Sequence, residues 1–303
     1  MMARAGRRAT AGARFDVKTA WCVAFALTLG GLMGCPSDDK NAIRLGVDRS
    51  LKPLGLARFL VAGFEEQSDD RVVVRYGGTE ELLAWANAGE LDEVLMVSES
   101  ALDALYKEGL PVRVETYAHE ELVLIGPFQN YLGRHAKDSG SRLLQHLARN
   151  NHLYFKGKKG SVEWARHQRL FRESGDREEP GAFFATEVEG VELVEKAIDQ
   201  QAFAFVRRSS LLETVLRGKR PHRIYKEQDP SLVLRLVLAE IHPGKAKRPT
   251  RPEFFDYVMG EEGQKAVAVF GKDRFGYPLF APGAPKEGEG AGVPKVTKEA
   301  QQQ

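Results

Sequence analysis

The stretch HEELVLIG at residues 119–126 decides the fold, and Pro127 follows it directly. Its four successive apolar residues indicate a strand that is buried on both faces, and a proline cannot continue such a strand. A second stretch of this kind, LVLRLVLA, occupies residues 232–239. The two stretches bracket about a hundred residues, which is an ordinary domain size. This spacing predicts two lobes that are joined by two crossing strands, at 119–126 and 231–239.

Strand and helix patterns alternate before residue 119. Short apolar or β-branched runs indicate strands, and apolar residues at helical spacing follow each of them. Such a β-α-β-α-β order predicts a mostly parallel sheet that is covered by helices. The expected strands are 43–47, 71–76 and 93–97, and the expected helices are 54–66, 80–88 and 102–108.

A second set of elements follows Pro127. The expected helices here are 143–148, 162–173, 190–200 and 254–270, and the expected strands are 153–155 and 202–206. We therefore expect an α/β protein in which residues 42–118 and 240–280 form lobe 1 and residues 127–230 form lobe 2. Ligands of such open sheets bind beyond the carboxyl ends of the strands, here between the lobes. Residues 281–303 are rich in Pro, Gly, Lys and Glu without an apolar period, which predicts a disordered tail.

The N-terminus has the pattern of an export signal. Five basic residues precede an apolar run at 20–29, which is too short to span a bilayer comfortably. The sequence LMGC at 32–35 resembles the lipobox of bacterial lipoproteins, because a small residue precedes a cysteine whose thiol can form a thioether. We therefore predict a signal peptide at 1–34, a diacylglycerol on Cys35 that anchors the chain to a membrane, and a polar tether at 35–41. A plain signal peptide and an N-terminal anchor helix are the alternatives.

Composition excludes several functions. Loss of residues 1–34 would lower the formal net charge from +2 to −2, so the basic character of the full chain gives no reason to expect nucleic acid as a partner. Cys22 would leave with the signal and Cys35 would carry lipid, so no cysteine would remain for a disulfide, a thiolate metal site or a nucleophile. His119 lacks the second histidine that a zinc metalloprotease motif requires. We therefore expect neither an enzyme nor a cofactor or metal site.

Several short motifs along residues 43–280 together resemble one protein family. Their order and spacing are similar to those of extracytoplasmic solute-binding proteins of ABC importers, specifically the tungstate-binding type. The motifs are IRL at 43–45 with Ser50, Gly55 and Leu56, GT at 78–79, LVLIGP at 122–127, EGQ at 262–264, and PLF at 278–280. The resemblance implies a two-lobed, type II periplasmic-binding-protein fold that closes on a small anion. It also implies an importer permease as partner and a location outside the cytoplasm, on the periplasmic side in a Gram-negative cell.

The ligand loops depart from the pattern of that family. Members usually carry a run of hydroxyl residues after the first strand, where this chain has VDRS at 47–50, and a small residue where it has Glu80. A second-lobe loop that normally contains an arginine, a glycine and two acids before Ser-Gly-Thr is KGKKGS at 156–161. A later arginine loop is kept in part as RRSS at 207–210. The resemblance therefore defines the fold more closely than it defines the ligand.

A fully ionised tetrahedral oxyanion only accepts hydrogen bonds, so its site needs hydroxyls, free backbone N–H groups at helix N-termini, and cations. Ser50, Thr79 and Ser161 each lie near a predicted strand end, and a helix is expected to begin near Glu80. Lysines and Arg208 would supply positive charge from the facing lobe. The ligand-binding residues that we expect are Asp48, Arg49, Ser50, Gly78, Thr79, Lys156, Lys158, Ser161, Arg208 and Ser209.

Structural roles are the alternatives for these residues. Ser50 and Thr79 could instead cap helices, because a hydroxyl can accept a hydrogen bond from a free N–H of the first turn. The lysine and glycine residues at 156–160 could form a solvated turn. Arg207 and Arg208 could be surface residues in ion pairs.

Asp48 and Glu80 oppose a fully ionised ligand, because a desolvated carboxylate beside a bound dianion is costly. Pairing of each acid with Arg49 or a lysine would remove this cost, and so would a protonated or cationic ligand. A third possibility is that the pocket no longer binds a ligand. We predict a lipid-anchored, extracytoplasmic solute-binding protein that captures a small oxyanion similar to tungstate or molybdate for an ABC importer. The alternatives are a lipoprotein sensor or scaffold on the same fold and a receptor for phosphate or another small anion.

Overall fold

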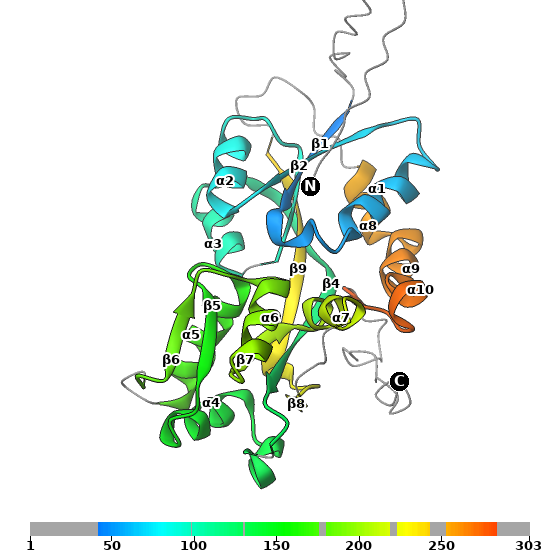
Figure 1. The fold of residues 1–303 in the computed structure, drawn as a ribbon. Coiled ribbons are helices and arrows are strands. Elements are labelled where there is room, and N and C mark those ends of the chain that lie inside the picture. The colour runs from blue at the N-terminus through cyan, green and yellow to red at the C-terminus, as the bar shows by residue number, and fades with distance from the viewer. Residues whose placement is uncertain are drawn as a thin grey trace, which may run out of the picture. The chain divides into compact units, whose positions relative to one another are not determined.

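The long strand β4 (Pro111–Gly126) organises the sheet. It pairs antiparallel with β9 (Val233–Ile241) over most of its length, so that the two strands lie side by side (Figure 1). The sequence predicted a strand only at 119–126, and this boundary is wrong, because the strand begins at Pro111. Residues 111–116 are exposed or half-buried, so they lack the continuous apolar run that marks the rest of the strand.

The computed structural model describes six segments of the chain, all within a unit that begins at Asn41. The predicted signal peptide, Cys35 and the tether lie outside these residues, as do residues 284–303 of the predicted tail. Among the described helices, none is both long and apolar enough to cross a membrane. The described segments are 42–97, 99–129, 131–175, 180–218, 223–242 and 253–283.

Ten described strands form one mixed sheet. The eight strands besides β4 and β9 are β1 (Ile43–Asp48), β2 (Val72–Gly77), β3 (Glu93–Met96), β5 (Tyr154–Lys158), β6 (Phe183–Thr186), β7 (Phe203–Arg207), β8 (Arg223–Lys226) and β10 (Ala281–Pro282). Their order is β2-β1-β3-β9-β4-β7-β5-β6, with β8 and β10 paired to β4. β1 is parallel to β2 and β3, and β5 is parallel to β6 and β7. β4 and β9 run antiparallel to their neighbours and join the two parallel groups. The predicted α/β class with a mostly parallel sheet is confirmed.

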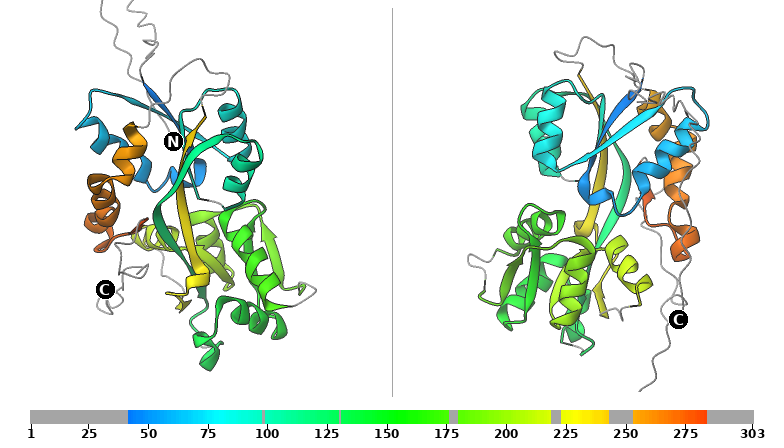
Figure 2. Two further views of the ribbon diagram at one scale, coloured as in Figure 1. Left: turned by 180° about the vertical axis from the view of Figure 1, so that it is seen from behind. Right: turned by 45° about the horizontal axis from the view of Figure 1, so that its top comes forward.

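Helices cover both faces of the parallel group β2-β1-β3 (Figure 2). Those of one face are α1 (Leu56–Glu65), α8 (Glu253–Met259) and α9 (Glu261–Val269), and those of the other face are α2 (Thr79–Asn87) and α3 (Glu99–Lys107). Successive residues of a strand point to opposite faces, so Leu95 of β3 packs in the core beneath α1 and α8, whereas Val94 and Met96 pack beneath α2 and α3. Burial on both faces explains why the sequence of β3 is continuously apolar after Glu93.

The second parallel group, β7-β5-β6, has the same construction. Its helices are α4 (Gly140–Arg149) and α5 (Val162–Ser174) on one face, and α6 (Gly190–Asp199) and α7 (Arg208–Leu216) on the other. Phe203 and Phe205 of β7 pack with α4 and α5, whereas Ala204 and Val206 pack with α6 and α7. The period of two therefore turns the side chain of Arg207, the last residue of β7, toward the face that α5 covers.

Other differences from the predictions include β6 and β8, which the sequence did not predict, and the following three segments. Residues 254–270 form two helices rather than one, because the backbone is extended at Gly260 (φ −73°, ψ 174°), which caps α9. Residues 208–210, expected in a loop, begin α7, whose buried polar first turn has no apolar period. Ala281 and Pro282, expected in the disordered tail, pair with β4. The remaining elements are the 3-10 turns η1 (Arg49–Leu51), η2 (Gly133–Lys137) and η3 (Pro230–Leu232), and the short helix α10 (Lys272–Phe275).

The division into two lobes, with a discontinuous lobe 1, stays a prediction. It would require contacts between the C-terminal helices and the N-terminal strands and helices. Such contacts include the rings of Phe254 and Phe64, which lie 5.6 Å apart, edge to face, and Glu93 Oε1 of β3, which accepts a hydrogen bond from Phe255 N at 3.1 Å. These contacts allow a direct test of the division by substitution at Phe254.

Candidate functional site

The first group of candidate residues lies where β1 and β2 end. These strands are parallel and in register, so their carboxyl ends meet at one edge of the sheet. Asp48 caps η1, since its Oδ1 accepts a hydrogen bond from Ser50 N at 2.9 Å. Gly78 is the N-cap of α2, and its N–H donates to Glu81 Oε2 at 2.9 Å. The alternative that Ser50 and Thr79 are helix caps is therefore wrong, and Thr79 is the first residue of α2.

The carboxylates of Asp48 and Glu80, at this edge of the sheet, are not paired with Arg49. The Arg49 guanidinium instead binds Glu81, with Nη2 2.5 Å from Oε2. The Asp48 carboxylate is held by the backbone of η1, and Glu80 is exposed in the first turn of α2. Arg49 therefore neutralises neither acid.

The second group lies at the ends of the parallel neighbours β5 and β7. Ser161 caps α5, since its Oγ accepts a hydrogen bond from Trp164 N at 3.2 Å. Lys156 is buried within β5, with Nζ 4.9 Å from the centroid of the Trp164 ring, and Lys158 is exposed at the end of the strand. The alternative of a solvated turn at 156–160 is therefore wrong for Lys156, because the turn begins only after Lys158.

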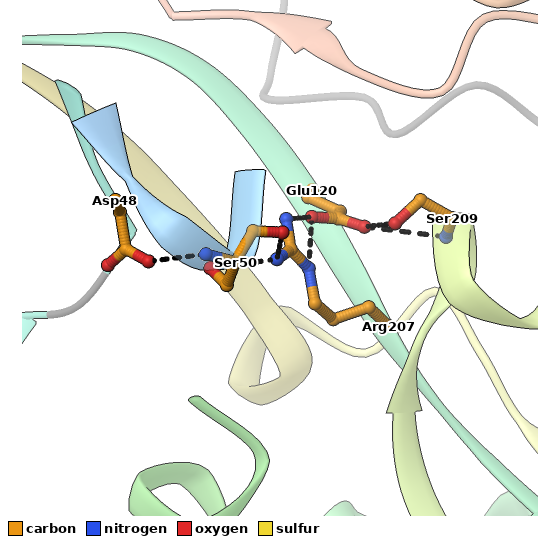
Figure 3. A network of polar contacts seen from close by, with 5 residues as sticks. All are labelled: Asp48, Ser50, Glu120, Arg207 and Ser209. Atoms are coloured by element: carbon orange, nitrogen blue, oxygen red, sulfur yellow. Dashed lines mark hydrogen bonds and ion pairs between the residues drawn. The ribbon is translucent and has the colours of Figure 1, made fainter. Parts of the chain in front are cut away.

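Arg207 joins the first group to β4 and α7 through a buried network (Figure 3). Its Nε donates to Glu120 Oε2 at 2.7 Å, Nη2 donates to the same oxygen, and the two side chains are 3% and 0% exposed. Its Nη1 donates to Ser50 Oγ at 3.2 Å, across 157 positions of sequence. Ser209 Oγ donates to Glu120 Oε1, and Asp48 extends the network through the backbone of Ser50. Of the expected residues, the structure thus brings Asp48, Ser50 and Ser209 together.

Arg208, which was expected to bind the ligand, lies in a different ion pair. Its Nη2 donates to Glu121 Oε2 and to Glu227 Oε2, each at 2.6 Å. Arg207 and Arg208 are thus both in ion pairs, as the alternative expected, but both are buried rather than on the surface. Among the described contacts it is Arg207, not Arg208, that reaches the end of β1.

Burial and charge act on Arg207 in opposite directions. Burial alone would lower the pKa of its guanidinium, but the adjacent Glu120 carboxylate outweighs this effect and keeps the pKa raised. Arg207 therefore stays charged. A buried pair of this kind is costly to break, because the remaining charge would stay desolvated without a partner.

Sequence analysis missed three residues around Arg207, namely Tyr117, Glu120 and Glu163. The Tyr117 hydroxyl and Glu163 Oε1 are buried without a hydrogen-bond partner in the part of the chain that the structure describes. Burial raises the pKa of both groups, and Arg207 acts on both to lower it. The sequence did contain a signal for Glu120. The adjacent acids Glu120 and Glu121 precede the apolar half of β4, and the adjacent arginines Arg207 and Arg208 lie at the end of β7, which indicates possible ion pairs between the two strands.

The chemistry of this network is that of hydrogen-bond donation. The described residues hold no group of three or more His, Cys, Asp or Glu that could bind a metal ion. One guanidinium and the hydroxyls of Ser50, Ser209 and Tyr117 instead gather around Glu120 and Asp48. Donors of this kind suit a ligand with several acceptor oxygens.

Sequence comparison connects the chain with bacterial solute-binding proteins. A profile of the family described as "Bacterial extracellular solute-binding protein" matches residues 55–158. The tungstate-binding protein TupA of Peptoclostridium acidaminophilum is 22% identical over 254 residues, which are 82% of this chain and 87% of that protein. The family is one of binding proteins rather than enzymes, as the sequence predicted.

Solved structures share the fold. The tungstate-binding protein TupA from Desulfovibrio alaskensis G20 superposes with a TM-score of 0.70 at 18% identity, over 80% of this chain and 99% of that one. The tungstate ABC transporter structure from Geobacter sulfurreducens gives 0.65 at 19% identity, over 76% and 99%. Iron-bound HitA from Pseudomonas aeruginosa gives 0.61 at 15% identity, over 85% and 91%. The fold expected from the sequence is thus confirmed.

Proposed function

We propose that this chain captures a small oxyanion for an ABC importer. The premise is that the chain is a bacterial extracellular solute-binding protein with the type II periplasmic-binding-protein fold. The observation that carries the proposal is the 3.2 Å contact between Arg207 Nη1 and Ser50 Oγ. This contact brings a buried guanidinium from one parallel strand group to a hydroxyl at the end of the other. Two of the similar proteins are named for tungstate binding, so tungstate and the chemically similar molybdate are the first candidates.

The donors that we assign to the ligand lie on five elements, namely η1, β4, β7, α2 and α5. Arg207 Nη1 and the Ser50 and Tyr117 hydroxyls would donate directly. The N-termini of α2 and α5, where Thr79 and Ser161 lie, would add backbone N–H groups and the positive end of each helix dipole. A fully ionised oxyanion offers only acceptors, so this donor set matches it.

The ligand would approach Arg207 at its Nη1 edge. Glu120 accepts from Nε and Nη2, whereas the two hydrogens of Nη1 face Ser50, with Oγ at 3.2 Å and the backbone oxygen at 3.3 Å. A ligand oxygen would share or replace one of these two long contacts. Glu120 already balances the charge of Arg207, and Asp48 adds a further carboxylate to the network. Neutral donors must therefore contribute much of the affinity, which lowers the preference for a highly charged ligand.

A thermal-shift and calorimetry panel tests this function. The full mature chain is titrated with tungstate, molybdate, phosphate and sulfate, and with chloride at matched ionic strength as the control. A ligand at a hundredfold excess over its Kd adds about 2.7 kcal/mol of stability, at about 2–4 °C of Tm per kcal/mol for a chain of this size. We expect at least one oxyanion to raise Tm by several degrees while chloride does not. If none of the four does, the chain is not an oxyanion receptor.

We also propose that the chain is anchored to a bacterial membrane through lipid on Cys35. The support is the LMGC sequence at 32–35 behind a basic and apolar leader. Expressed in a bacterium with a labelled fatty acid, the wild type and a Cys22→Ser control are expected to carry label and to sediment with membranes. Cys35→Ser is expected to lose both properties. Label that persists in Cys35→Ser would contradict the lipid site.

A sensor or scaffold on the same fold is the second candidate, and Glu120 favours it. Its carboxylate accepts hydrogen bonds from Arg207 and Ser209, which are donors that an external oxyanion would use. In this alternative an internal carboxylate permanently replaces the ligand. We would then expect that no anion of the thermal-shift panel raises Tm.

A further inference from the structure

Glu163, the second residue of α5, is an acid of the kind that helix N-termini favour, but it is unusual in being buried. It lies in the first turn of α5, its side chain is buried, and Oε1 has no hydrogen-bond partner within the described segments. Buried carboxyl groups are normally paired, because an unpaired charge in a protein interior is costly. Such a group needs either a proton of its own or a donor that comes from elsewhere.

The position of Glu163 connects it with the proposed anion site. Its carboxyl group interacts with its own backbone N–H and with Ser161, the N-cap of α5, so it lies at the N-terminus of that helix. The strand β7 beneath α5 turns Arg207 toward the same face, and the two charges act on each other. Gly157 of β5 allows the N-terminus of α5 to pack closely against that strand, because a Cβ there would lie 3.1 Å from both Ser161 Oγ and Glu163 Cβ. The unpaired oxygen and the ligand-facing guanidinium thus belong to one region.

The charged groups around Glu163 do not neutralise it. Arg207 from β7 is the cation that acts on it, and that charge is already paired with Glu120. Glu189, which precedes α6, adds negative charge. The buried Arg166, one turn further along α5, donates to the backbone oxygens of Ser231 and Val233. The other titratable groups of the packed elements include Lys156 of β5, whose Nζ lies against Trp164, His167 of α5, Lys196 and Glu192 of α6, and Arg142, His146 and Arg149 of α4. Burial is the strongest influence on Glu163, and it raises the pKa.

We propose that Glu163 shares one proton with the bound oxyanion, so that the complex holds a single proton between Oε1 and a ligand oxygen. This inference rests on the proposed function. A hydrogenphosphate ion would bring that proton itself. A fully ionised sulfate, molybdate or tungstate would bind only to protonated Glu163, and where Glu163 is ionised it must take the proton from water. As the pH rises, the site therefore increasingly prefers ligands that bring their own proton over fully ionised ones.

Calorimetry on the wild-type chain gives the first test. Each anion is titrated from about pH 6 to pH 9 in two buffers with different heats of ionisation. Above the pKa of Glu163, sulfate, molybdate or tungstate binding is expected to take up about one proton and to weaken about tenfold per pH unit, since binding is linked to one protonation. Hydrogenphosphate binding is expected to take up none and to stay constant from about pH 7.5 upward, where that ion predominates. This measurement needs no variant to fold.

A matched pair of variants gives the second test. In Glu163→Gln the amide donates permanently, so the affinity for sulfate, molybdate or tungstate is expected to become independent of pH. Glu189→Gln removes a negative charge that acts on Glu163 but leaves the carboxyl group, so the pH dependence is expected to remain. Binding of a fully ionised anion by wild type without proton uptake and without loss of affinity at any pH up to about 9 would overturn the inference, and so would unchanged pH dependence in Glu163→Gln. Either result would leave anion capture intact, whereas a chain that binds none of the four anions would fail the proposed function itself.

Discussion

Replacement of Arg207 with alanine is expected to lower the free energy of unfolding by roughly 3–5 kcal/mol, the usual cost of breaking a buried ion pair from one side. Glu120, which is 0% exposed, would keep Ser209 as a donor but lose its counter-ion. Its carboxyl group would then favour the protonated form, so the variant is expected to recover part of the lost stability at acidic pH. Denaturant unfolding at two pH values measures both effects. The oxyanion-induced rise in Tm is expected to disappear in the same variant.

The double variant Glu120→Leu/Arg207→Met is the matched control. It removes both charges and fills the space with apolar side chains, so it is expected to be much more stable than Arg207→Ala. It is also expected to bind no oxyanion, because the guanidinium is gone. Equal stability losses in the single and double variants would show that packing, rather than the lone charge, governs this position. Oxyanion binding that survives in either variant would remove Arg207 from the site.

Replacement of Phe254 with alanine is expected to cost roughly 3–5 kcal/mol, as for other large buried aromatic side chains. Phe254 is fully buried in α8 and packs edge to face against Phe64 of α1. If residues 240–280 belong to lobe 1, the lost stability should weaken the β2-β1-β3 group first. Hydrogen exchange followed by peptide resolves this, because local opening exposes the amides of the weakened unit.

Phe205→Ala provides the comparison in the other group of strands. Phe205 is also buried, and it lies in β7 beside Tyr154. We expect faster exchange in β5, β6 and β7 for this variant and in β1, β2 and β3 for Phe254→Ala. Uniform acceleration throughout the chain in both variants would mean that the sheet unfolds as one unit, and the division into lobes would be wrong.

The elements that the sequence predicted well are those with an unambiguous hydrophobic period. Buried parallel strands such as β3 and β7 carry continuous apolar runs, and α1 carries its apolar residues at helical spacing. The elements that the sequence predicted poorly lack a clear hydrophobic period. The N-terminal half of β4 is exposed on one side, and α7 begins with charged and hydroxyl residues that only tertiary contacts can bury. A local pattern cannot distinguish such a helix start from a loop.

The candidate site was predicted by region rather than by residue. Strand ends could be located from the sequence, and Ser50, Ser161 and Ser209 do lie at the carboxyl ends of strands. The sequence favoured Arg208 over Arg207, because adjacent residues at a strand end cannot be assigned to a face without knowing where the strand stops. A shift of one position reverses the direction of the side chain. β7 ends at Arg207, and this boundary aims that side chain at Glu120 and Ser50.

The amino-acid sequence by itself determined the order of strands and helices, the α/β class and the export pattern of the N-terminus, because each depends on periodicity or composition within a short window. Tertiary structure alone decided which charges meet. Glu120 and Arg207 are 87 positions apart, and Ser50 and Arg207 are 157 apart. Whether a guanidinium faces a carboxylate, a hydroxyl or a ligand depends on how distant strand ends approach in space, and no local pattern of residues encodes that distance.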